Sequence, residues 1–156
     1  MKFHFLSSNN PEAKNTEKKL TELFGQNSVE DADYIIPIGG DGLLLKSLHN
    51  FNKLNKPFFG INFGSIGFLM NNLSNENLND MIANAKKSTF KPLKMTAQSV
   101  NNEIFEAYAY NEVSLMRQTH LASKIKIKIN EKVKMEELIC DGVLLSTSAG
   151  STAYNL

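Results

Sequence analysis

The chain has 156 residues, 42% of them hydrophobic, so it is long enough to form one good core or two small domains. Its 17 Lys and Arg against 16 Asp and Glu give a net charge of +1, which favours neither nucleic acid nor an anionic membrane as a partner. The single cysteine, Cys140, excludes an internal disulfide, and no stretch resembles a signal peptide or a membrane span, so we expect a soluble cytoplasmic protein.

The first half of the sequence alternates between expected strands and helices. Apolar runs bounded by turn residues predict strands at residues 2–6, 34–38 and 57–61. Apolar stripes at helical spacing predict helices at about residues 11–24, 41–51 and 75–87. The alternation predicts an α/β domain with a parallel sheet over residues 1–90.

Four residues between the second strand and the second helix read Gly39-Gly40-Asp41-Gly42. Such a turn brings backbone N–H groups and the positive end of a helix dipole to the carboxyl edge of a sheet, where α/β proteins bind phosphates. A carboxylate does not attract phosphate, so Asp41 is predicted to deprotonate an acceptor hydroxyl or to help hold Mg²⁺ during phosphoryl transfer. The alternative is a simple turn, in which the aspartate bonds neighbouring backbone.

The loop at residues 62–72, NFGSIGFLMNN, follows the third strand. It therefore comes to the same sheet edge as Asp41 and is predicted to form the floor of a nucleotide pocket, with Phe63 and Phe68 as its aromatic residues. The alternative is that its apolar side chains pack beneath a tight turn.

Beyond Thr89 the pattern changes to extended segments at residues 94–100, 104–115, 123–129 and 133–146. Asn-rich turns join them, and residues 124–129 alternate strictly between Lys and Ile. We therefore expect a second, antiparallel all-β domain over residues 91–156, with its lysine stripe in solvent.

Two places in this second half depart from the strand pattern with polar groups. Asn111 and Glu112 interrupt an apolar run, and either a ribose diol or neighbouring backbone would satisfy them. Residues 146–152 are rich in Ser, Thr and Gly, which suits either close contact with a ligand or a helix cap.

Four motifs now stand in order: GGDG at 39–42, NFGSIGFL at 62–69, NE at 111–112 and DGVLLSTSAGSTAY at 141–154. Together they resemble NAD kinases, which transfer a phosphoryl group from ATP or polyphosphate to the adenosine-ribose 2′-hydroxyl of NAD to give NADP. GGDG alone is shared with lipid kinases of the related superfamily and with 6-phosphofructokinase, whereas the NE and GSTAY motifs discriminate. The alternatives are a lipid kinase and a dinucleotide-binding module without catalysis.

The resemblance implies a role for each matching residue. Asp41 would activate the 2′-hydroxyl, and Gly40 and Gly42 would shape the phosphate turn. The residues that would bind the dinucleotide are Phe68 beside the adenine, Asn111 and Glu112 on the ribose hydroxyls, Thr152, Ala153 and Tyr154 around the adenine and its ribose, and Asp141 at the nicotinamide end.

The resemblance also implies a divalent cation, an oligomer and a longer C-terminal part of the chain. Mg²⁺ or another divalent cation would accompany the phosphate donor, no residue being assigned as its ligand, and the protein would form a homodimer or homotetramer with site residues shared across subunits. Family members continue past the GSTAY motif through further strands of the β-sandwich, which binds NAD, and then return to the first domain. We therefore expect a C-terminally truncated chain with an incomplete second domain.

Overall fold

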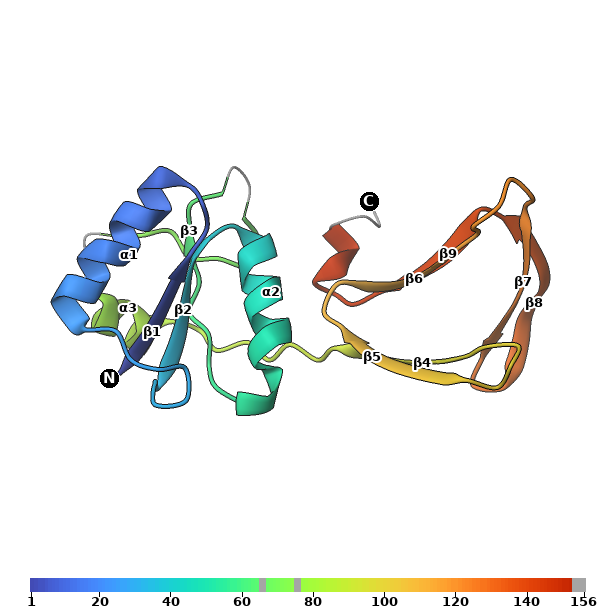
Figure 1. Cartoon of the computed structure of the whole chain (residues 1–156), viewed down its shortest axis with the longest axis horizontal. Coiled ribbons are helices and arrows are strands. Elements are labelled where there is room, and N and C mark those ends of the chain that lie inside the picture. Colours follow the sequence, from blue (N-terminus) through green and yellow to red (C-terminus); the bar gives the residue numbers. More distant parts are fainter. Residues whose placement is uncertain (65–66, 75–76, 153–156) are drawn as a thin grey trace. The chain divides into compact units, whose positions relative to one another are not determined.

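The computed structural model describes residues 1–64, 67–74 and 77–152. Its contacts divide the chain into two compact units, Met1–Thr89 and Phe90–Leu156. The first unit is built from helices around a parallel sheet, and the second consists almost wholly of antiparallel strands (Figure 1).

The first unit contains a three-stranded parallel sheet in the order β1-β2-β3. Its elements are, in chain order, β1 (Phe3–Ser7), α1 (Pro11–Phe24), β2 (Tyr34–Gly39), α2 (Asp41–Phe51), the 3₁₀ turn η1 (Asn52–Leu54), β3 (Ile61–Asn62) and α3 (Leu78–Asn84). The prediction of an α/β fold with a parallel sheet is thereby confirmed.

Two elements of this unit are shorter than expected. The third strand was predicted to begin at Pro57, but β3 is reduced to Ile61 and Asn62, and Phe58 forms only an isolated bridge to Ile35. The last helix was predicted to end near residue 87, but it stops at Asn84 because Ala85 adopts an extended backbone.

The helices cover both faces of the sheet. Phe5, Ile36 and Ile38 belong to a buried cluster that also contains residues of α1 and α3, such as Leu20 and Ile82. Alternation along a strand places the neighbouring residues on the opposite face, where the ring of His4 meets that of Phe51 in α2, with 6.1 Å between ring centroids. Figure 1 accordingly shows the sheet between α1 and α2.

Both ends of α1 follow from local chemistry. The side chain of Asn10 accepts a hydrogen bond from the Glu12 N–H at 2.8 Å, and Pro11 occupies the first turn. The helix ends before Gly25, whose φ of 75° is readily adopted only by glycine. In the part of the chain that the structure describes, no helix is long and apolar enough to cross a membrane.

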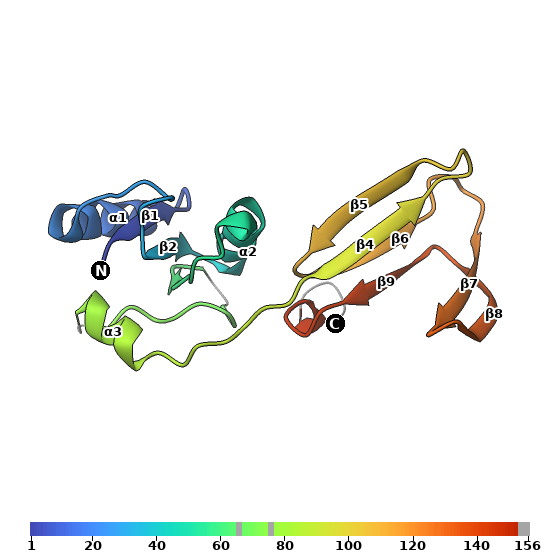
Figure 2. The same ribbon diagram turned by 90° about the horizontal axis from the view of Figure 1, so that it is seen from below.

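The second unit contains three two-stranded antiparallel sheets. These sheets pair β4 (Leu93–Gln98) with β5 (Ile104–Ala109), β6 (Glu112–Met116) with β9 (Gly142–Ser146), and β7 (Ser123–Ile129) with β8 (Lys132–Cys140); the 3₁₀ turn η2 (Gly150–Thr152) follows. Figure 2 shows β4 and β5 as two long arrows side by side, joined by a tight turn. The antiparallel all-β character of this half is confirmed.

Two of the expected long strands are broken. The segment at residues 104–115 divides at Tyr110 and Asn111, whose carbonyls accept hydrogen bonds from Thr147. The segment at residues 133–146 divides at Asp141, where the pairing partner changes from β7 to β6. The predictions of two continuous strands are therefore wrong, because long-range contacts end the ladders.

Charged side chains line the ribbons in cross-strand pairs. Lys124 lies 3.2 Å from Glu137, and Lys126 lies 2.7 Å from Glu136, which agrees with a lysine stripe in solvent. Lys94 Nζ lies 2.7 Å from Glu106 Oε1. This hydrogen bond, together with the opposite charge of each partner, lowers the pKa of Glu106 and raises the pKa of Lys94. Exposed pairs of this kind contribute little to stability.

Candidate active site

The glycine turn after β2 places Asp41 as the first residue of α2. Its carboxylate accepts two backbone hydrogen bonds, Oδ2 from the Phe68 N–H at 2.9 Å and Oδ1 from the Leu69 N–H at 3.2 Å. Both donors lie far along the chain, so this carboxylate does not serve a local turn. It holds the loop after β3 against the start of α2.

The same two loops also meet through their backbones. The Phe63 N–H donates to the Gly39 carbonyl at 2.6 Å, and a Cβ added to Gly64 would lie 3.0 Å from the Cα of Gly40. Asn62 supports this arrangement, since its Oδ1 accepts the Gly64 N–H at 2.9 Å. The convergence of both loops on one sheet edge therefore agrees with the sequence pattern, and a side chain at position 64 would press on the backbone of Gly40.

The aromatic residues of the loop behave differently from one another. Phe63 packs against the buried cluster, as the alternative of a packed turn predicts. Phe68 is 71% exposed, although its N–H is bonded to Asp41. An exposed ring beside a polar group suits stacking on a nucleotide base.

The loop after β1 also reaches this sheet edge, which the sequence analysis did not assign to the site. The Ser8 N–H donates to the Ile38 carbonyl at 3.0 Å, and the side-chain amide of Asn10 donates to the Phe63 carbonyl at 3.3 Å. The signal was available, because the loop after the first strand of a parallel sheet lies at the same edge as the loops after the others.

In the second unit, the turn after β9 is fastened to the start of β6. The Thr147 N–H donates to the Asn111 carbonyl at 2.7 Å, and Thr147 Oγ1 donates to the Tyr110 carbonyl at 2.6 Å. The same Oγ1 accepts the Gly150 N–H at 3.0 Å. The structure thus joins two places that the sequence presents separately, through Thr147, which the sequence analysis included in the Ser- and Thr-rich stretch without assigning it a partner.

Glu112 begins β6 and pairs with Ser146 across the ladder. Its Oε2 atom is buried and has no hydrogen-bond partner among the residues that the structure describes. Such an orphaned acceptor is costly, and a ligand hydroxyl would satisfy it. The alternative that neighbouring backbone satisfies Glu112 does not hold for this oxygen.

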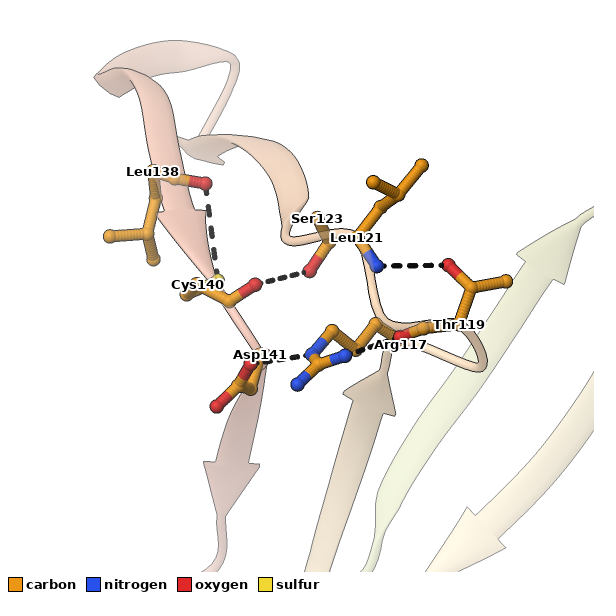
Figure 3. Close-up of polar contacts among 7 residues, drawn as sticks. All are labelled: Arg117, Thr119, Leu121, Ser123, Leu138, Cys140 and Asp141. Carbon is orange, nitrogen blue, oxygen red and sulfur yellow. Dashed lines mark hydrogen bonds and ion pairs between the residues drawn. The ribbon is translucent and has the colours of Figure 1, made fainter.

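The remaining candidates of this unit lie at the two ends of β9. Thr152 closes η2 beyond one end, whereas Ala153 and Tyr154 lie outside the described residues. Asp141 lies at the other end, where its carboxylate meets Arg117 (Figure 3). Asp41 and its glycines thus group with Phe68 in the first unit, and the other described candidates belong to the second.

Metal ligands are sparse across residues 1–64, 67–74 and 77–152. In these ranges, no group of three or more His, Cys, Asp or Glu side chains is arranged to hold a metal ion. Asp41 is the carboxylate at the glycine turn. This sparsity is compatible with Mg²⁺, which usually binds through one or two carboxylates together with substrate phosphates and water.

The sequence of this chain is similar to those of known proteins. Residues 1–88 match the family model described as the ATP-NAD kinase N-terminal domain. The NAD kinase of Brucella suis is 48% identical over 153 residues, which cover 98% of this chain and 60% of that protein. The NAD kinase of Rhizobium meliloti is 45% identical over 152 residues, covering 97% of this chain and 59% of that protein.

A solved structure shares the fold. The yeast NADH kinase, crystallised with NADH, matches 99% of this chain and 56% of its own with a TM-score of 0.69 and 19% sequence identity. The chain therefore spans about 60% of the length of the curated relatives that it matches.

Proposed function

Because this chain belongs to the NAD kinase family, we propose that it transfers a phosphoryl group from ATP or polyphosphate to the adenosine-ribose 2′-hydroxyl of NAD, giving NADP. In-line phosphoryl transfer requires the protein to position the reactants and to stabilise charge, and it requires no covalent nucleophile. A glycine turn can bind the phosphates through its backbone, and one carboxylate can position the acceptor hydroxyl.

The observation that carries the proposal is the position of the Asp41 carboxylate. A carboxylate offers about four acceptor positions, and the N–H groups of Phe68 and Leu69 take two of them. The bonded carboxylate is fixed in direction and still has acceptor capacity for a substrate hydroxyl. In this role Asp41 orients the 2′-hydroxyl and takes its proton as the phosphoryl group arrives.

The phosphate donor would lie at the glycine turn. Gly40 precedes α2 and Gly42 lies in its first turn, so their backbone can approach phosphate oxygens at the positive end of the helix. Mg²⁺ bound to the donor phosphates would neutralise the charge that develops during transfer. Asp41 is the residue at this turn able to contact such an ion.

The second unit would bind the dinucleotide. In the proposal Asn111 and Glu112 hold ribose hydroxyls, and the buried Oε2 of Glu112 supports this assignment because it lacks a partner among the described residues. By the family resemblance, Thr152, Ala153 and Tyr154 would contact the adenine and its ribose, and Asp141 the nicotinamide end. Phe68, which belongs to the first unit, would stack beside the adenine. We further propose a cytoplasmic homodimer or homotetramer in which subunits share site residues.

The proposed function is tested by incubating the protein with NAD, Mg²⁺ and either ATP or polyphosphate, and measuring NADP enzymatically. Vesicles that contain diacylglycerol serve as a competing acceptor. NADP without lipid phosphorylation is the expected result. Lipid phosphorylation would indicate a lipid kinase, and NAD binding without NADP would indicate a non-catalytic module.

Gly42 offers a test of the donor site that is separate from folding. Among the described residues, apart from its chain neighbours and the backbone of its own helix, an added Cβ would meet no atom within 4 Å, so packing in this part of the chain does not require glycine here. We expect Gly42→Ala to keep or raise the melting temperature, since alanine favours a helix by up to about 1 kcal/mol over glycine. We also expect the KM for ATP to rise because a methyl group then occupies the approach of the phosphates. Steady-state kinetics against ATP, with thermal unfolding of the same samples, measures both effects, and an unchanged KM would remove Gly42 from the donor site.

A further inference from the structure

Arg117 and Asp141 meet where two of the β ribbons join. The β6–β9 ladder ends with Met116 opposite Gly142, and the β7–β8 ladder begins with Ser123 opposite Cys140. Six residues, 117–122, therefore connect β6 to β7, whereas a single residue, Asp141, connects β8 to β9. The extra residues form a loop at this junction, which is visible in Figure 3.

The backbone and the side chain of Arg117 both engage this junction. The Arg117 N–H donates to the Asp141 carbonyl at 2.8 Å, which continues the ladder by one step. The side-chain Nε donates to Asp141 Oδ1 at 2.5 Å, and Nη1 donates to the Thr119 carbonyl. The guanidinium is thus held on two sides, between the loop and the carboxylate (Figure 3).

These bonds fix the Asp141 side chain without burying it. The Arg117 side chain is 32% exposed and that of Asp141 is 75% exposed. Within the described part of the chain, Asp141 Oδ2 accepts no hydrogen bond. The carboxylate therefore has one oxygen anchored by Arg117, and Figure 3 shows the other pointing away from the guanidinium, where it is free to accept a hydrogen bond from a ligand.

An exposed ion pair contributes little to the stability of a fold. Its effect here is on geometry, because a planar guanidinium with several fixed N–H groups restricts its partner to few orientations. A lysine has a single ammonium group and cannot hold both Asp141 and the Thr119 carbonyl in the same fixed way. The two hydrogen bonds of Arg117 therefore restrict the orientation of the Asp141 carboxylate, and with it the position of Oδ2.

We propose that Arg117 is a positioning residue, which orients the Asp141 carboxylate to accept a hydrogen bond from the nicotinamide end of NAD. The inference rests on the proposed function, and within that function it assigns a role to a residue outside all four motifs. Pre-orientation lowers the cost of ordering the side chain when NAD binds. The role concerns binding of the acceptor, and the phosphate donor is unaffected.

The test is a double-mutant cycle in which the Kd for NAD is measured by calorimetry and the KM and kcat by NADP formation. We expect Arg117→Gln to raise the Kd and KM for NAD by about 3- to 10-fold with little change in kcat or in the KM for ATP. Arg117→Lys should lie between this variant and the unmodified protein. Arg117→Gln added to Asp141→Asn should cause no further loss.

Lys124→Gln is the matched control. It removes the cation of another exposed pair, Lys124 with Glu137, from a neighbouring part of the same unit and should leave the Kd for NAD unchanged. If Arg117→Gln binds NAD like the unmodified protein, or if its loss adds fully to that of Asp141→Asn, the positioning role is wrong while the kinase assignment stands. If the unmodified protein neither binds nor phosphorylates NAD, the proposed function fails and this inference fails with it.

Discussion

Replacing Asp41 by asparagine is expected to lower kcat/KM for NADP formation by about 10²- to 10⁴-fold, the usual contribution of a general base. Asparagine keeps the size of the side chain but cannot take a proton from the 2′-hydroxyl. It also exchanges one acceptor for an NH₂ group, which then faces the N–H of Phe68 or of Leu69. We therefore expect a second effect: the free energy of unfolding should fall by about 1–3 kcal/mol, because one backbone N–H loses its hydrogen-bond acceptor.

The two effects are separable because they have different readouts. Loss of the base lowers kcat, whereas loosening of the loop lowers the melting temperature and weakens NAD binding. Asp80→Asn is a suitable control, since it removes a carboxylate from the first turn of α3 in the same unit and should leave turnover unchanged. If Asp41→Asn lowers the melting temperature but retains normal kcat, Asp41 serves as a tie between loops and another group accepts the proton.

How far the fold could be predicted depended on the range of the interactions that determine it. The strand at residues 123–129 was predicted with its exact bounds, because strict Lys and Ile alternation is a local signal. The break at Tyr110 and Asn111 was marked in the sequence only by the polar pair Asn111 and Glu112. The partner that ends the strand could not be predicted, since the two carbonyls accept hydrogen bonds from Thr147, which lies 37 residues beyond Tyr110. Apolar residues continue on both sides of that break, so the local pattern favours one strand.

The candidate site shows the same division. The convergence of Asp41 with the loop after β3 follows from strand order, because carboxyl ends of parallel strands share one edge. The hydrogen-bond donors to the Asp41 carboxylate could not be predicted in this way, since they are backbone N–H groups, which every residue type except proline provides. Arg117 was missed for a related reason: its contact with Asp141 depends on where two ladders meet, and the sequence does not specify that register.

Gly150→Ala is expected to abolish or strongly weaken NAD binding, raising the Kd by at least about 10-fold. A Cβ at position 150 would overlap the carbonyl of Asn111, a backbone group that cannot rotate away like a flexible side chain. To relieve the overlap, η2 must move away from β6, and the hydrogen bond from the Gly150 N–H to Thr147 Oγ1 is then strained or lost. We expect a destabilisation of about 1–3 kcal/mol, typical of overpacking. Calorimetric titration with NAD and thermal unfolding measure the two quantities.

The Gly150 prediction depends on Asn111 and the turn after β9 acting as one binding surface. Gly42→Ala controls for the exchange of glycine for alanine as such, because its Cβ has no packing contact within 4 Å among the residues that the structure describes, and its melting temperature should not fall. If Gly150→Ala lowers the melting temperature yet binds NAD normally, the close contact with Asn111 supports only the fold. If NAD binding weakens far more than the loss of stability can account for, the contact sets the spacing between Asn111 and Glu112, which we propose bind the ribose, and the segment that ends in Thr152.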